Sequence, residues 1–379
     1  MPRRLLLFIV IFLLPSCSAC WDIRELNNSA VCTGAGVELS REGKFIFSGQ
    51  MVKPSAPSES GTQTSTAVVL SASGSGVADA ARRFMLSLSR FPEWSSISTF
   101  VIGEKLAQDD LALLGDFLLR NRNLRPTVNL VLSRGCTPED VLSLPMPLSP
   151  YSGKGLETIL DLQEKQLGIY VPTNVNEFVH KLTTAGIEPI VPQVSIEEKK
   201  LFISGTAVFK GRRIVGSLNE TESRGYRWMN ARSFNGGIID LGSPQNPSEL
   251  VSLEVKQFTG KTTPKLEQDQ LKMKITIRAE LVFYEKSNSG ELLTLSWKEE
   301  LERLAAQEIK QEISACIKKS QLLGSDILGW GYILQKHEPQ LWESFSANWG
   351  DLFPTIESDI EVETLIVNSM LSQKSFRFR

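Results

Sequence analysis

Residues 271–283, LKMKITIRAELVF, decide the fold class of the C-terminal part of the chain. Every second residue from Leu271 to Phe283 is apolar. From Lys272 to Glu280, the residues between them are polar: Lys272, Lys274, Thr276, Arg278 and Glu280. Because the pattern repeats every two residues, the apolar side chains lie on one face of the strand. This is typical of an antiparallel strand with one buried face.

The longest predicted helix, 301–323, follows this strand. Its apolar residues recur every four positions, as one face of a helix requires, at Leu301, Ala305, Ile309, Ile313 and Ile317. Shorter helices are predicted at 326–335 and 339–349, and a last strand at 356–367. The pattern predicts a compact α+β unit over residues 263–379.

Strands and helices alternate over residues 20–194. Strands are predicted at 31–39, 44–52, 67–71, 98–102 and 127–132. Helices are predicted at 78–88, 108–120, 156–167 and 174–185, and one begins at Thr137-Pro138, where proline takes the first helical position. In 78–88 the residues predicted to face inward are Ala81, Phe84, Met85 and Leu88. This alternation predicts one sheet with helices packed against it.

Residues 195–262 form a middle, β-rich region. Its predicted strands are 200–209, 213–218, 236–241 and 250–257. Residues 220–228 are interpreted as polar turns with a cap. Together with a leader at 1–19, the predicted domain boundaries fall after residues 19, 194 and 262.

The N-terminus reads as a secretory signal. Arg3 and Arg4 precede ten apolar residues, 5–14, which are too few to cross a ~30 Å hydrocarbon core. Small residues then lead to Cys17 and Cys20, and a thiol in this position can take a diacylglyceryl group. Cys17 has Leu14 three residues before it and Cys20 has Ser18 and Ala19 before it, so the residues alone leave both sites open.

Composition sets limits on the class of protein. The chain has 379 residues, of which 41% are hydrophobic and 22% are charged, a composition typical of globular proteins. Its length predicts two or three domains. The net charge of −2 becomes −4 without Arg3 and Arg4, so the surface as a whole attracts neither nucleic acid nor anionic lipid. Cys32, Cys136 and Cys316 are expected to be buried and free.

No catalytic, metal or cofactor site is predicted. His180 and His337 are the only histidines and lack partners at ligand spacing, so each is interpreted as a surface or capping residue. No nucleophile elbow or phosphate-binding loop appears. The aromatic residues 330–349 could form a partner surface or a core, and we favour a core.

Several ordered motifs resemble the C-subunit lipoproteins of spore germinant receptors, the Ger(x)C family. They begin with Cys20-Trp21-Asp22-Ile23-Arg24-Glu25 and continue through 50–55, 101–107 and 116–120. The later positions that carry the resemblance include Gly205, Phe209, Asp326, Gly329, Gly331 and Trp349. Each motif alone is weak, but their common order along the chain is specific.

The resemblance implies a non-enzymatic lipoprotein on the outer face of the spore inner membrane. It implies a three-domain α+β arrangement with unusual folds, lipid attachment at Cys20, and A-type and B-type membrane subunits as partners in nutrient-triggered germination. Cys17 departs from the pattern, since an aliphatic residue is expected three positions before the lipidated cysteine. The alternative hypothesis is a solute-binding lipoprotein that feeds a membrane transporter, which would have two similar lobes around a cleft.

Overall fold

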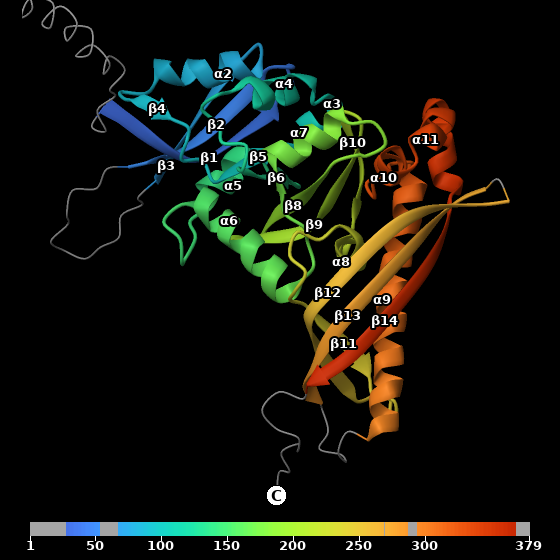
Figure 1. The fold of residues 1–379 in the computed structure, drawn as a ribbon. Helices are drawn as coiled ribbons and strands as arrows, with labels where there is room; N and C mark the ends of the chain where they lie inside the picture. The colour runs from blue at the N-terminus through green and yellow to red at the C-terminus, as the bar shows by residue number, and fades with distance from the viewer. Residues whose placement is uncertain (1–27, 54–66, 269, 287–293, 369–379) are drawn as a thin grey trace, which may run out of the picture.

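The computed structural model describes residues 28–53, 67–268, 270–286 and 294–368, which form two sheets (Figure 1). The larger sheet has ten strands in the order β10-β9-β8-β6-β5-β1-β2-β3, with β4 paired to β1 and β7 to β6. Their bounds are β1 Ser29–Leu39, β2 Phe45–Val52, β3 Ala67–Gly74, β4 Phe91–Glu93, β5 Thr99–Ile102, β6 Asn129–Ser133, β7 Thr173–Asn174, β8 Ile190–Glu197, β9 Lys200–Lys210 and β10 Arg213–Leu218.

Helices cover both faces of this sheet. They are α2 Val77–Arg83, α3 Glu104–Asp109, α4 Ala112–Arg120, α5 Pro138–Ser143, α6 Ser152–Leu162 and α7 Val175–Thr183. Along β5, Phe100 and Ile102 join a core with α2, α3, α4 and α7, whereas Val101 joins a core with α5 and α6. Successive strand residues point to opposite faces, so both faces of β5 are buried. The predicted α/β layers are confirmed.

The second sheet has four strands in the order β11-β12-β13-β14. Their bounds are β11 Ile238–Gly242, β12 Leu250–Glu267, β13 Gln270–Lys286 and β14 Glu357–Asn368. Helix α9, Leu295–Leu323, is the longest element of the connection between β13 and β14, which run parallel. In β13 the alternation is as predicted, with Leu271, Met273 and Ile275 buried beside half-buried Lys272 and Lys274. The antiparallel prediction holds for its pairing with β12 and not for β14.

Residues 220–228, interpreted as polar turns, instead belong to a helix, α8 Glu220–Asn230. Asn219 accepts a hydrogen bond from Glu222 N, and the Glu222 side chain accepts one from Asn219 N. This reciprocal cap satisfies two otherwise unpaired amide groups at the start of the helix. Gly225 within α8 lies against the backbone of α9, so packing compensates for its weak helix propensity.

Three other predictions of local structure are corrected. The helix predicted at 108–120 is two helices, because Asp110 is extended and its Oδ1 accepts from Ala112 N at 2.8 Å. Met85, predicted to face inward, is 50% exposed, since the helix tightens to a 3₁₀ turn (η3) at Phe84–Leu86. The helix predicted from residue 326 begins at Trp330 as α10, Trp330–His337.

The sheets do not follow the boundaries predicted from the sequence. Strands β9 and β10 of the middle region pair into the large sheet, and residue 262 lies inside β12. The division into three domains therefore stays a prediction. Two further helices, α11 Pro339–Phe345 and α12 Trp349–Leu352, complete the fold. In the described ranges, no helix is both long and apolar enough to cross a membrane.

Candidate functional site

Five of the family-motif positions meet where α9 ends against the large sheet. Helix α9 stops at Gly324, whose φ of +58° is a left-handed conformation that glycine adopts without strain. Ser325 Oγ then donates to Phe209 O at 2.5 Å, and Glu188 N donates to Asp326 O at 2.9 Å. These bonds join the end of α9 to β9 and to the loop before β8. We call this contact the Asp326 junction.

The carboxylate of Asp326 holds the junction together. Its Oδ1 accepts from Trp330 N at 3.0 Å, and its Oδ2 accepts from Gly331 N at 2.9 Å and Trp349 Nε1 at 3.0 Å. One side chain therefore caps the start of α10 and binds the first residue of α12. Burial raises the pKa of Asp326 to about 7, although these three donors favour the ionised form.

Gly331 allows α10 to approach the loop between α7 and β8 closely. A Cβ on Gly331 would lie 2.6 Å from Gly186 Cα and 2.8 Å from the rings of Trp342 and Trp349, closer than packed atoms tolerate. Tyr332 N donates to Gly186 O at 2.8 Å across the same contact. Gly329, with φ of +68°, turns the chain immediately before α10. Both glycines are required by backbone geometry.

The aromatic residues around the junction form a core. Trp330 is fully buried, and Trp342 and Trp349 are 9% and 8% exposed. Their rings contact one another and Phe353 in edge-to-face or tilted geometry at centroid distances between 5.4 and 6.4 Å. The interpretation as a core is confirmed, and these rings are not an open partner surface.

Gly205 lies apart from the junction, within β9. Its φ is +152°, and a Cβ there would lie 3.0 Å from both Gln193 Oε1 and Leu218 O. The neighbouring Thr206 hydroxyl hydrogen-bonds Ser223 of α8 at 3.0 Å. Gly205 therefore lets β9 pass close to its neighbours near α8, and the structure does not bring it together with Asp326.

A second buried polar group was missed from the sequence. Glu312 of α9 accepts from Arg224 Nε and from Trp228 Nε1 of α8, each at 2.6 Å. Arg224 Nη2 also donates to Ile238 O at 2.7 Å. Burial raises the pKa of Glu312, while the nearby guanidinium acts to lower it. The signal in the sequence was an acidic residue beside Ile309 and Ile313, on the apolar face of the long helix.

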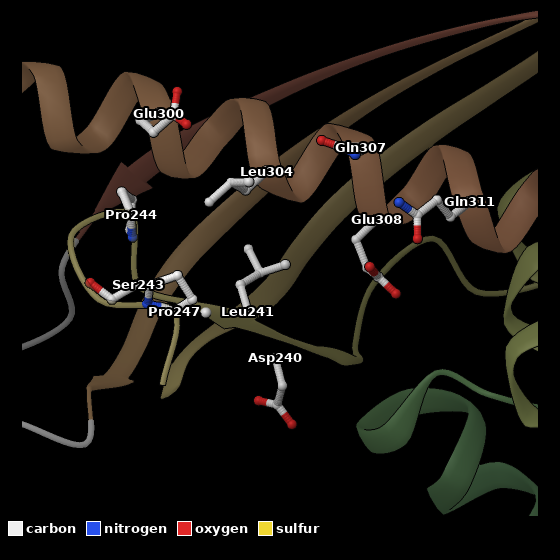
Figure 2. A pocket seen from close by; sticks show the side chains of 11 residues that line it. Asp240, Leu241, Ser243, Pro244, Pro247, Glu300, Leu304, Gln307, Glu308 and Gln311 are labelled. Carbon is white, nitrogen blue, oxygen red and sulfur yellow. The ribbon is translucent and has the colours of Figure 1, made fainter. Parts of the chain in front are cut away.

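A surface groove of about 470 Å³ lies between β11, the residues that follow it and α9 (Figure 2). Leu304 of α9 faces Leu241 of β11 across it. Its lining is otherwise mainly carboxylates, amides and prolines: Asp240, Glu300, Glu308, Gln307, Gln311, Pro244 and Pro247. Ser243 Oγ hydrogen-bonds no group in the described part of the chain, so no neighbouring base activates it. The groove can hold a polar segment but does not assemble a catalytic pair.

The remaining predicted residues have structural surroundings or lie outside the described chain. His180 packs against the ring of Tyr332, and His337 is exposed at the end of α10. Cys32 and Cys316 are buried free thiols as predicted, whereas Cys136 is only half-buried. Among described residues, no cluster of metal-ligating side chains occurs. The motif residues at the mature N-terminus lie outside the described residues: Cys17, Cys20, Trp21, Asp22, Arg24 and Glu25.

The fold and these contacts define a class of protein: a two-sheet α+β protein whose buried polar residues join its parts. Two family models match consecutive parts of the chain. The model for the spore germination protein N-terminal domain matches residues 22–196, and the model described as spore germination B3/GerAC like, C-terminal, matches residues 204–370. The chain belongs to this family of spore germination proteins, Ger(x)C, as the motifs indicated.

Curated relatives and a solved structure agree with this assignment. Spore germination protein KC of Bacillus subtilis (strain 168) is 24% identical over 388 residues, covering 95% of this chain and 94% of its own. The putative spore germination protein YfkR of the same organism is 24% identical and covers 83% of each chain. The crystal structure of the GerBC protein is similar in fold, with a TM-score of 0.60 at 16% identity, over 92% of this chain and 100% of that one.

Proposed function

We propose that this protein is the lipid-anchored, non-catalytic C subunit of a nutrient germinant receptor, needed for assembly or function of the receptor in spore germination. The observation that carries the proposal is the similarity to spore germination protein KC, which extends over nearly the full length of both chains. A match of this extent includes both sheets and the Asp326 junction.

The proposed anchor is a diacylglyceryl group on Cys20, with Cys17 as the second candidate. Support comes from the apolar run at 5–14 and from Trp21-Asp22, which follow Cys20 as in the family motif. Two acyl chains give stable membrane attachment, because each buried methylene contributes ~0.8 kcal/mol. The proposed location is the outer face of the spore inner membrane, beside A-type and B-type integral membrane subunits.

A structural role is favoured by what the buried polar groups do. Asp326 and Glu312 each bind donors of the protein itself, which leaves neither carboxylate open to a substrate. The alternative of a solute-binding lipoprotein requires two similar lobes with a cleft between them. Sheets of ten and four strands with different orders do not provide such a pair.

Metabolic labelling with a palmitate analogue tests the anchor. We expect sporulating cells to incorporate label into the wild-type protein and into a Cys17→Ala variant, and to lose it in a Cys20→Ala variant. Cys17→Ala is the matched control because it changes the same leader by one thiol. Label retained in the Cys20→Ala variant would move the anchor to Cys17, and no label in any of the three proteins would overturn lipid attachment.

Deletion and purification test the receptor role. We expect spores that lack this protein to lose the response to at least one nutrient germinant. We also expect the tagged protein, purified from detergent-solubilised spore inner membranes, to retain A-type and B-type subunits that an unrelated tagged lipoprotein does not retain. Unchanged responses to every nutrient tested, together with no retained subunit, would overturn the proposal.

A further inference from the structure

We propose that the surface formed by α2, the 3₁₀ turn Phe84–Leu86 and β4 lies against an anionic phospholipid bilayer. The inference deepens the proposed function, since it rests on lipid attachment near residue 20. It adds which face of the folded protein the anchor holds toward the membrane.

The first argument is where the chain enters the fold. Ser29, the first residue of β1, pairs in register with Phe91 of β4, so the chain joins the large sheet beside this surface. Eight residues separate Cys20 from Ser29. Even fully extended, the connecting segment spans at most about 30 Å. An anchor at Cys20 therefore keeps this end of the molecule close to the lipid.

The second argument is the apolar exposure beside that entry point. Leu86 is 83% exposed and Met85 is 50% exposed, although the preceding Phe84 is fully buried. The ring of Phe84 contacts Trp94, next to β4, at 5.8 Å, which fixes η3 over this part of the sheet. Two adjacent large apolar side chains that point to solvent from a fixed turn are suited to the acyl boundary of a membrane.

The third argument is charge. Arg82 and Arg90 flank the exposed apolar pair, and neither forms an ion pair with any residue that the structure describes, whereas Arg83 pairs with Asp79. The neighbouring segment 116–125 adds Arg120, Arg122 and Arg125 against one carboxylate, Asp116. Phe47 contacts both Phe84 and Phe117, which places α4 beside η3. In a chain of net charge −2, this local excess of arginine is complementary to anionic lipid.

The second sheet presents a different surface. The outer face of β14 carries Glu357, Asp359, Glu361 and Glu363 at alternating positions. Three of these carboxylates pair with Lys272, Lys274 and Arg278 of β13, so this face carries no excess of positive charge. Figure 1 shows the C-terminal end of β14 far from α2. A basic, apolar face beside the anchor, and a second sheet whose outer charges are mostly paired, give the protein one favoured orientation on an anionic membrane.

Spin labels on the full-length lipidated protein test this orientation. The protein carries Cys136→Ser to remove the half-buried thiol, and a label at either Leu86→Cys or Leu365→Cys, both exposed positions. It is reconstituted into phosphatidylcholine vesicles containing 30% phosphatidylglycerol. We expect the label at 86 to be more accessible to oxygen than to a water-soluble nickel chelate, as in a bilayer, and the label at 365 to show the reverse.

Charge variants separate the surface from the anchor. Arg82→Gln with Arg90→Gln is expected to lower the equilibrium constant for the bilayer-facing orientation by about 25-fold, since each arginine near an anionic surface contributes roughly fivefold. Arg278→Gln with Arg303→Gln makes the same change of charge on β13 and α9, and is expected to leave this equilibrium constant unchanged. Flotation with the vesicles is expected to be the same for both variants.

Two outcomes contradict the proposal and differ in meaning. If the protein floats with the vesicles but the label at 86 is as accessible to nickel as the label at 365, this surface does not face the bilayer, and the anchor stands. If the wild-type protein does not float, lipid attachment itself fails, and the membrane-facing placement fails with it. Circular dichroism confirms that each labelled protein is folded before it is used.

Discussion

The contact between α8 and α9 and the Asp326 junction are both built on a buried carboxylate, but they balance its charge in different ways. Glu312 accepts from Arg224 and from the indole of Trp228. Asp326 accepts from two backbone amides and the indole of Trp349, and it forms no ion pair within the described residues. A cation neutralises the first carboxylate, whereas the second depends on uncharged donors, two peptide N–H groups and one indole.

This difference determines how the stability of each contact responds to substitution and to pH. In the α8–α9 contact, removing the cation leaves a buried charge without compensation. At the Asp326 junction the charge is sensitive to pH, because burial has moved its pKa to about 7. The first contact is therefore vulnerable to substitution of its arginine, and the second to pH and to small changes in backbone spacing.

Arg224→Met is expected to have the largest effect. Glu312 would remain buried without its cation, so the free energy of unfolding should fall by ~3–5 kcal/mol near neutral pH. Urea unfolding followed by circular dichroism measures it. The loss should shrink at lower pH, where Glu312 becomes protonated.

The double variant Arg224→Met with Glu312→Leu is the matched control for this prediction. Because it removes both charges, it should recover most of the lost stability. A double variant no more stable than Arg224→Met would show that the guanidinium acts through packing or through its bond to Ile238 O, and not by compensating Glu312.

Gly331→Ala is expected to come second. The added Cβ would lie 2.6 Å from Gly186 Cα, so α10 must move away from the loop between α7 and β8, at a loss of ~1–3 kcal/mol. Thermal unfolding measures the change. Gly350→Ala in α12 is the control, because no atom lies within 4 Å of its Cβ position. Equal effects of the two substitutions would contradict the close approach at the junction.

Asp326→Asn is expected to reduce stability by ~1–3 kcal/mol at pH 8, because the amide NH₂ group would face N–H donors.

The contribution of Asp326 to the stability of the wild-type protein also depends on pH. The pKa of Asp326 is raised from 3.8 to about 7 on folding. Between about pH 4 and pH 7, the folded protein therefore keeps a proton that the unfolded chain has already released. The stabilising effect of this proton is fully present below pH 4 and is lost as pH rises to about 7.

Urea unfolding of the wild type and the Asp326→Asn variant at pH 5 and pH 8 tests this dependence. On going from pH 5 to pH 8, the free energy of unfolding should fall more for the wild type than for the variant. Parallel pH dependence in both proteins would show that Asp326 does not titrate in this window.

Glu361→Gln is expected to have the smallest effect. Its carboxylate pairs with Lys274 at 2.6 Å on the exposed face of the second sheet, where water and salt screen the interaction. The change in unfolding midpoint should lie within experimental error at 0.15 M salt. A loss as large as that of Arg224→Met would remove the distinction between buried and exposed carboxylates.

Local patterns predicted much of the fold. The two-residue period of 271–283 predicted β13, and the four-residue spacing from Leu301 to Ile317 predicted the buried face of α9. Both segments are long, and each buries one continuous face, so the period is clear. Helix α8 was missed because Gly225 and several polar residues masked its pattern, although the spacing of Asn219 and Glu222 is a helix-capping signal.

The candidate site could be predicted in part. Asp326, Gly329, Gly331 and Trp349 were singled out by resemblance, but nothing in their spacing showed what the carboxylate binds. Ser325 and Phe209, whose hydrogen bond joins the end of α9 to β9, are 116 positions apart. The position of Glu312 opposite Arg224 depends likewise on how α8 packs on α9.

The sequence by itself determined the α+β class, the long strand and long helix, and the family. These features depend on residue order and on periods within a single segment. Only the tertiary structure decided that β9 and β10 complete the large sheet, that Asp326 and Glu312 are buried among donors, and that Leu86 is exposed beside the entry of the chain. Each of these depends on contacts between distant segments, whose geometry no local period encodes.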